Sequence, residues 1–141
     1  MNFDSSSIMA ENIIRVIFDT NFLMIPTQFK VDVFAEIKRI MTQPYELCIY
    51  QGSIDELQDV AKGSGKDTGH AKIALSLIKQ KNLKSLPNSI NEKYADNLIL
   101  EGVTSKDIVC TQDQALKRLL RNKHKGIRLI ALKSKKYLGF E

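Results

Sequence analysis

The pattern of apolar and polar positions predicts strands and helices that alternate along most of the chain. Residues 13–18 (IIRVIF) form a β-branched apolar run, which is typical of a strand buried on both faces of a parallel sheet. Apolar positions spaced by three and four residues from Val31 to Met41 predict a helix that Pro44 ends, and residues 46–50 (ELCIY) predict a second strand. The chain therefore opens as strand, helix, strand.

The same alternation continues over the rest of the chain. Ser53 followed by Glu56 fits a capping box, so we expect a helix from there to the glycines at 63–65, and Asn91 is the expected cap of a helix over 92–102. The other expected elements are a helix over 67–82, strands over 83–86 and 107–110, a helix over 115–125 and a strand over 126–132. This order predicts an α/β fold, a three-layer sandwich with helices on both faces of a parallel sheet.

A chain of 141 residues, of which 43% are hydrophobic, fits one domain with one sizeable core. We expect residues 1–12 to be a flexible lead-in, residues 13–132 to form the domain and residues 133–141 to be a basic C-terminal tail. No apolar run approaches the roughly 18 residues of a membrane span, and the polar start lacks a signal-peptide pattern. We therefore expect a soluble, cytoplasmic protein.

Basic charge is concentrated near the C-terminus. The net charge is +5 with a pI near 9.2, yet residues 1–113 hold twelve Lys or Arg against fifteen Asp or Glu. Residues 114–141 hold nine basic residues and one acid. A solvated charged face explains most such runs, but the absence of acids from Gln114 to Phe140 favours a polyanion as partner.

Four acidic residues are candidates for one edge of the predicted sheet, beyond the carboxyl ends of the strands, where parallel sheets bind ligands. Asp19 directly follows the first strand, and Asp113 follows the strand at 107–110. Glu56 lies near the start of the helix after the second strand, and Asp96 lies within the helix over 92–102. Each also has a purely structural interpretation as a turn, cap or exposed helix residue.

Carboxylates that share one crevice repel one another, so their convergence would imply a divalent cation. Ligation by oxygen alone favours Mg²⁺ or Mn²⁺ over Zn²⁺, and neither His70 nor His124 has a partner at metal-ligand spacing. Such a metal can activate water for attack on a phosphodiester. Glycine-rich phosphate loops are absent from the sequence, and Cys48 and Cys110 lie in apolar runs that indicate a core role.

Four segments resemble the acidic motifs of PIN domains, in the order of that family. They are VIFDTNFLM, SIDELQDV, YADNLIL and CTQDQALKRLLR, and the resemblance covers the chain from about Arg15 to Leu132. The stretch TQDQALKRLLRNKHKGIRLIAL is similar to the PIN endonucleases of small-subunit ribosomal RNA processing and their archaeal counterparts. The resemblance implies a five-stranded parallel sheet of order 3-2-1-4-5 and Mg²⁺- or Mn²⁺-dependent cleavage of single-stranded RNA.

By motif position, the resemblance implies that the metal carboxylates are Asp19, Glu56, Asp96 and Asp113. It makes Asn21 a neighbour that orients water or Asp19, and Thr111 a hydroxyl that supports the ligands. Asn97 departs from close relatives that carry a further acid there, which would weaken binding of a second ion. The side chains expected to hold RNA phosphates are Lys117, Arg118, Arg121, Lys123, Lys125, Lys133, Lys135 and Lys136.

The leading interpretation is thus an endoribonuclease, with structured or single-stranded RNA, including precursor ribosomal RNA, as its partner. One alternative is the toxin of a toxin–antitoxin pair, which would share the chemistry and add a protein partner. Another is a non-catalytic RNA-binding factor of ribosome assembly. A DNA nuclease of the flap-endonuclease kind ranks last because the chain has no room for a helical arch. PIN domains often pair, so a homodimer is a further expectation.

Overall fold

The computed structural model describes residues 12–88 and 95–141, with side chains from Asn97 onward in the second range. The described chain forms one six-stranded sheet of order β3-β2-β1-β4-β5-β6. This confirms the expected order of the first five strands and adds a sixth. Apart from Asn12, which lies in a turn, the predicted lead-in falls outside the described residues, as does the predicted Asn91 cap.

The central strand β1 (Ile14–Phe18) is buried on both faces, as its apolar sequence predicts. Val16 and Phe18 pack into the core on one side of the sheet, and Ile17 packs into the core on the other. Because successive side chains of a strand point to opposite faces, an unbroken apolar run fits this position. The other parallel strands are β2 (Tyr45–Tyr50), β3 (Lys84–Leu86), β4 (Ile108–Cys110) and β5 (Arg128–Lys133).

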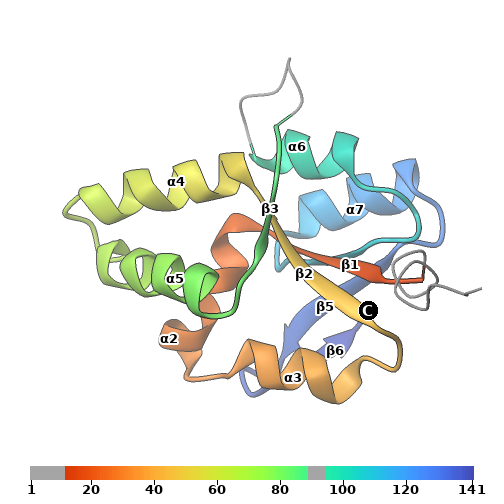
Figure 1. Cartoon of the computed structure of the whole chain (residues 1–141), viewed down its shortest axis with the longest axis horizontal. Coiled ribbons are helices and arrows are strands. Elements are labelled where there is room, and N and C mark those ends of the chain that lie inside the picture. Colours follow the sequence, from red (N-terminus) through yellow and green to blue (C-terminus); the bar gives the residue numbers. More distant parts are fainter. Residues whose placement is uncertain (1–11, 89–94) are drawn as a thin grey trace, which may run out of the picture.

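Helices cover both faces of the sheet, with α6 and α7 on one side and α3 and α5 on the other (Figure 1). No helix in the described ranges is both long and apolar enough to cross a membrane. The helical segments are the 3-10 helix η1 (Thr20–Met24) and the α-helices α2 (Ile25–Phe29), α3 (Val33–Ile40), α4 (Gln51–Lys62), α5 (Thr68–Gln80), α6 (Ala95–Gly102) and α7 (Gln114–Lys123).

The predicted capping box at Ser53 is wrong. Helix α4 begins two residues earlier, at Gln51, and its N-cap is Tyr50, which makes no side-chain capping bond. Ser53 is fully buried, and its hydroxyl has no hydrogen-bond partner among the described residues. Strand β2 ends at Tyr50 and α4 begins at Gln51, with no loop between them. Ser53 therefore lies inside the first turn of the helix.

The predicted basic tail is also corrected, because part of it is a strand. Strand β6 (Tyr137–Phe140) pairs antiparallel with β5 and forms the edge of the sheet. The turn that reverses the chain contains Ser134 and Lys135, both in the left-handed backbone region with φ of 52° and 56°. The last residue, Glu141, donates its backbone N–H to the carbonyl of Leu129 at 2.9 Å.

Candidate active site

Asp19 lies at the carboxyl end of β1, where the strand changes into η1. Its backbone N–H donates to the carbonyl of Cys110 at 3.0 Å, which extends the pairing of β1 with β4 by one residue. Its Oδ1 accepts a 2.8 Å hydrogen bond from the backbone N–H of Thr20 and so caps η1. The residue is only 6% exposed. The structural role as a cap and the position at the sheet edge therefore coexist.

Thr111 connects Asp19 with Asp113. The register that pairs Phe18 with Cys110 places the two following residues side by side. The buried Thr111 hydroxyl donates to Asp19 Oδ2 at 2.8 Å and accepts the backbone N–H of Asp113 at 3.1 Å. Asp113 in turn caps α7, because its Oδ1 accepts the N–H of Leu116 at 3.1 Å. One hydroxyl thus fixes the segments that carry both acids.

The two carboxylates line one pocket of about 400 Å³ at the carboxyl edge of the sheet. Asn21, which the PIN resemblance singled out, lies in the same lining and is exposed. Sequence reasoning missed the rest of the lining, which comes mainly from η1 and α2. Pro26 was the available signal, because proline is typical of the first turn of a helix. The missed lining residues are Phe22, Ile25, Gln28, Phe29 and Gln112.

Glu56 and Asp96 stay predictions as members of this site. Glu56 is half-buried in the second turn of α4, which packs against η1, but it does not belong to the lining of the pocket. Asp96 is the second residue of α6 as described, and its side chain lies outside the described part of the structure. The described structure therefore brings two of the four predicted acids together.

The donors in the pocket fit a hard divalent cation. The described side chains contain no group of three or more His, Cys, Asp or Glu arranged to hold a metal. The pocket is nevertheless lined by the polar side chains of Asp19, Asp113 and Asn21. Each offers only oxygen as a metal ligand, which suits Mg²⁺ or Mn²⁺. Only one of the two Asp113 oxygens accepts a hydrogen bond from the described residues, so the other can bind an ion.

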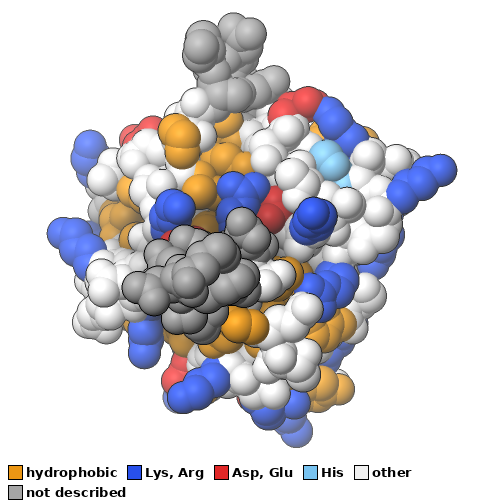
Figure 2. All heavy atoms as spheres, turned by 45° about the vertical axis from the view of Figure 1, so that its right-hand side comes forward, with side chains coloured by type: hydrophobic (Ala, Val, Ile, Leu, Met, Phe, Trp, Pro, Cys, Tyr) orange, Lys and Arg blue, Asp and Glu red, His pale blue; other side chains and the backbone are white. Residues whose placement is uncertain are grey.

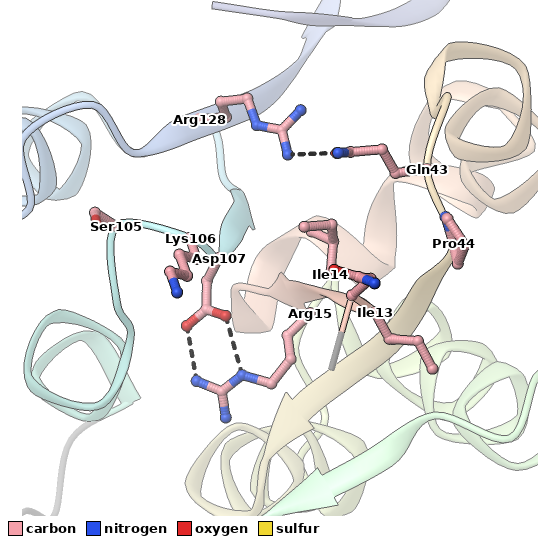
Figure 3. Close-up of a pocket in the computed structure, with 10 residues that line it drawn as sticks. Ile13, Ile14, Arg15, Gln43, Pro44, Ser105, Lys106, Asp107 and Arg128 are labelled. Carbon is pink, nitrogen blue, oxygen red and sulfur yellow. Dashed lines mark hydrogen bonds and ion pairs between the residues drawn. The ribbon is translucent and has the colours of Figure 1, made fainter. Parts of the chain in front are cut away.

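A larger pocket of about 560 Å³ lies at the opposite, amino edge of the sheet (Figure 3). Its acid, Asp107, is 4% exposed and binds Arg15 through two hydrogen bonds of 2.7 and 3.0 Å. The adjacent Arg128 donates to Gln43 at 3.2 Å. Because its one carboxylate is neutralised by a bidentate arginine, this pocket lacks the acidic character of the carboxyl edge.

Neither histidine belongs to a metal site in the described structure. His70 contacts the Thr27 hydroxyl and His124 contacts the Leu100 carbonyl, each at 2.7 Å. Both cysteines are buried free thiols, which confirms their predicted core role. Burial raises the pKa of the Cys48 thiol to about 11, and it also raises the pKa of the Cys110 thiol. Neither thiol is therefore suited to act as a nucleophile at neutral pH.

The basic residues separate into groups with different surroundings. Lys117 was expected to hold RNA phosphates from the surface. Its side chain is instead 2% exposed, and its ammonium group pairs with the Glu141 carboxylate at 2.6 Å. Lys123 pairs with Glu101 on the surface. Lysine and arginine side chains are spread over the face drawn in Figure 2 rather than gathered in one patch. The exposed members of the predicted set are Arg118, Arg121, Lys123, Lys125, Lys135 and Lys136.

The β5–β6 turn brings Lys135 and Lys136 to the carboxyl edge of the sheet, which is the edge that holds the pocket. Gln112 of the pocket lining contacts the end of β5 directly, since its Oε1 accepts the N–H of Leu132 at 2.6 Å. Helix α7 instead begins beside Asp113 and leads back toward the amino edge, as a connection between parallel strands must. Basic residues late in α7 are therefore farther from the pocket.

Comparison with known proteins agrees with this architecture. The model of the PIN-like domain family matches residues 16–135. Ribonuclease VapC4 of Methanocaldococcus jannaschii is 33% identical over 128 residues, which cover 87% of this chain and 93% of that protein. The rRNA-processing protein fcf1 of Schizosaccharomyces pombe is 31% identical over 125 residues, which are 86% of this chain but only 60% of fcf1.

A solved structure of the PIN domain endonuclease Utp24 superposes with a TM-score of 0.76. The match covers 90% of both chains at 28% sequence identity. The family model spans the segments that hold Asp19, Thr111 and Asp113, and the structural neighbour shares the fold over 90% of this chain. The chain belongs to the PIN-like domain family.

Proposed function

We propose that this chain is a metal-dependent endoribonuclease that cuts single-stranded RNA at the pocket lined by Asp19 and Asp113. The observation that carries the proposal is the pair of carboxylates at the carboxyl edge of the sheet. Thr111 joins the two residues, because its hydroxyl donates to Asp19 Oδ2 and accepts the backbone N–H of Asp113. The names of the relatives, a ribonuclease, an rRNA-processing protein and an endonuclease, support RNA cleavage as the reaction.

Asp19 and Asp113 would hold Mg²⁺ or Mn²⁺, and Glu56 and Asp96 are proposed as further ligands. When bound, the metal supplies a water of lowered pKa and neutralises charge on the phosphate. Thr111 keeps Asp19 in one orientation, because it donates to Oδ2 while the N–H of Thr20 holds Oδ1. Ligands that are fixed in this way need less reorganisation when they bind an ion.

Asn21 is placed to position the substrate in the pocket. Its side chain is exposed in the lining beside both acids, and the described residues give it no hydrogen-bond partner. An amide can donate to a phosphate oxygen or accept from the attacking water. We therefore assign Asn21 an orienting role and no proton transfer.

The exposed lysines of the β5–β6 turn are the proposed contacts for RNA phosphates nearest the pocket. Lys135 and Lys136 are exposed at the carboxyl edge, whereas Lys117 is buried in an ion pair. Contacts to phosphate position the strand without reading its sequence. The turn would thus hold the RNA backbone across the edge at which the carboxylates lie.

The name of fcf1, an rRNA-processing protein, favours precursor ribosomal RNA as the substrate of this chain, and the name of Utp24 supports an endonuclease. A toxin paired with an antitoxin protein is the alternative with the same chemistry. The match to 93% of Ribonuclease VapC4 does not separate these two biological settings. The substrate range separates them.

The test is a cleavage assay with the purified chain on precursor ribosomal RNA, generic single-stranded RNA and duplex RNA of matched length. Each substrate is incubated with Mn²⁺, with Mg²⁺ or with EDTA. We expect metal-dependent cutting of single-stranded regions, with discrete products from the precursor. Equal cutting in EDTA would contradict metal dependence, and intact RNA under every condition would contradict the enzymatic proposal.

A further inference from the structure

Beyond its carboxylates, the proposed active-site pocket has an apolar side that ends in an exposed aromatic ring. Phe22 and Ile25 are 1% and 2% exposed and form the closed part of this side. Phe29 lines the same pocket but is 39% exposed. A large apolar side chain that lines a pocket and remains open to water is a candidate for ligand contact.

Phe29 is presented by a short helix that is fixed at several points. Within α2, the Thr27 hydroxyl bonds to the carbonyl of Met24 at 3.2 Å, and it contacts His70 of α5 at 2.7 Å. The helix ends directly after Phe29, because Lys30 adopts the left-handed conformation with φ of 56°. The ring is therefore held by an ordered backbone at the rim of the pocket.

The two glutamine amides that line the pocket with this ring differ in their hydrogen bonding. Both ends of the Gln112 amide bond to the backbone of Leu132, at 2.6 and 3.5 Å, which makes Gln112 a fixed part of the wall. Gln28 is exposed, and its amide makes no hydrogen bond with any described residue. A flat ring next to an uncommitted amide can bind a flat ligand with polar edges.

We propose that Phe29 stacks on an unpaired base of the RNA, in the nucleotide next to the one whose phosphate lies at Asp19 and Asp113. This inference rests on the proposed function and adds a base-binding subsite to it. Stacking tolerates every base because each has a π-face, while the Gln28 amide contacts the edge of the base. A duplex offers no free base face, so the subsite selects single strands.

Tryptophan fluorescence tests the contact directly, because the chain contains no tryptophan. Phe29→Trp places one indole in the pocket, and we expect single-stranded RNA, added in EDTA without divalent metal, to quench its emission. The matched control is Phe140→Trp, since Phe140 is 41% exposed but lies on β6 outside the pocket. Equal quenching of both variants, or of neither, would overturn the proposal.

Kinetics then test the energetic role of the ring. Loss of one stacked base predicts that Phe29→Ala raises KM by roughly 5- to 150-fold. Phe29→Tyr keeps the ring and should stay near the wild type, as should Phe140→Ala. Removal of the base beside the cleavage site from the RNA should raise the KM of the wild type but not that of Phe29→Ala, because the two changes delete the same interaction.

The outcomes separate the subsite from the enzymatic proposal. RNA that is cut in Mn²⁺ with equal KM by the wild type and Phe29→Ala would leave the nuclease in place and overturn the subsite. Selective quenching of Phe29→Trp by RNA that is never cut would support the subsite and contradict the enzymatic proposal. Equal effects of the base removal on wild type and Phe29→Ala would also count against stacking.

Discussion

The Thr111 hydroxyl donates a 2.8 Å hydrogen bond to Oδ2 of Asp19, which lies 92 residues away in the sequence. The same hydroxyl accepts the backbone N–H of Asp113. Parallel pairing of β1 with β4 makes this possible, because it brings the residues that follow both strands to one edge. A single buried hydroxyl thereby couples the two acids of the proposed active site.

Thr111→Val should separate this coupling from the fold. Valine has nearly the same shape but removes the hydroxyl that accepts the N–H of Asp113 and donates to Oδ2 of Asp19. We expect unfolding to become easier by about 1–3 kcal/mol and RNA cleavage to slow by about 10- to 100-fold. Thr111→Ser keeps the hydroxyl and should retain most of the activity. Equal rates for the valine and serine variants would contradict the role assigned to the hydroxyl.

Charge removal at the β5–β6 turn should weaken RNA binding more than removal at the end of α7. We compare Lys135→Ala/Lys136→Ala with the matched pair Lys123→Ala/Lys125→Ala, which lies toward the amino edge. Removal of one lysine that binds a phosphate should lower the salt dependence of single-strand binding by about 0.7 in log–log slope. The measurement is RNA affinity at several salt concentrations. Equal slopes for the two double variants would argue against the position proposed for the strand.

The Lys117–Glu141 pair should stabilise the fold. Lys117 is buried, so Glu141→Gln leaves its ammonium group without a full counter-charge, and we expect a loss of about 3 kcal/mol in the free energy of unfolding. The control is Glu101→Gln, which breaks the surface pair with Lys123 and should cost less than about 1 kcal/mol. Urea denaturation measures both. Similar small losses in both variants would contradict the importance of the buried ammonium.

The same pair predicts a pH dependence. The ammonium of Lys117 holds the pKa of the Glu141 carboxyl below its usual value of 4.5. A lowered pKa in the folded state gives stability that is present above the unfolded-state pKa and lost as pH falls through the folded-state pKa. The difference in urea midpoint between wild type and Glu141→Gln should therefore be largest at neutral pH and shrink as the pH falls below 4.5. A constant difference would refute this linkage.

Gly102→Ala should destabilise the protein although alanine normally favours a helix. A Cβ on Gly102 would clash with the Tyr50 hydroxyl, so we expect a loss of about 1–3 kcal/mol instead of the usual gain of about 0.5–1 kcal/mol. Tyr50→Phe should recover part of the loss in the double variant, and Gly65→Ala should be nearly neutral because no atom lies within 4 Å of its added Cβ. Thermal unfolding of the wild type, the three single variants and the double variant measures these effects, and additive losses in the double variant would argue against the clash.

The sequence predicted the sheet well because its apolar runs report burial directly. The run at 13–18 fits β1, whereas the order of the first five strands was predicted by the resemblance to PIN domains. Strand β6 was missed for a physical reason. Its turn uses Ser134 and Lys135 at positive φ, where glycine or asparagine would ordinarily signal a hairpin. The lysines of this segment instead predicted a solvated basic tail.

The candidate site was predictable only where a residue lies within a few positions of the carboxyl end of a strand. Asp19 directly follows β1 and Asp113 lies three residues past the end of β4, and the structure places both in one pocket. The apolar side of the pocket comes from η1 and α2, two five-residue helices that are too short to show a clear period. The burial of Lys117 was also hidden, because its partner Glu141 comes from the end of β6, the strand that the sequence did not reveal.

The most direct test of the account is the rate of Mn²⁺-dependent cleavage of single-stranded RNA by Asp19→Asn. Asparagine keeps an oxygen for the N–H of Thr20, and the Thr111 hydroxyl can rotate to accept from its amide, so the substitution removes the charge while both neighbours can still hydrogen-bond to the side chain. The control is Asp32→Asn, at the exposed N-cap of α3. We predict that Asp19→Asn cuts slower by about 100-fold or more with an unchanged unfolding midpoint, and that Asp32→Asn cuts at the wild-type rate. Cleavage by Asp19→Asn at the wild-type rate would contradict the central claim.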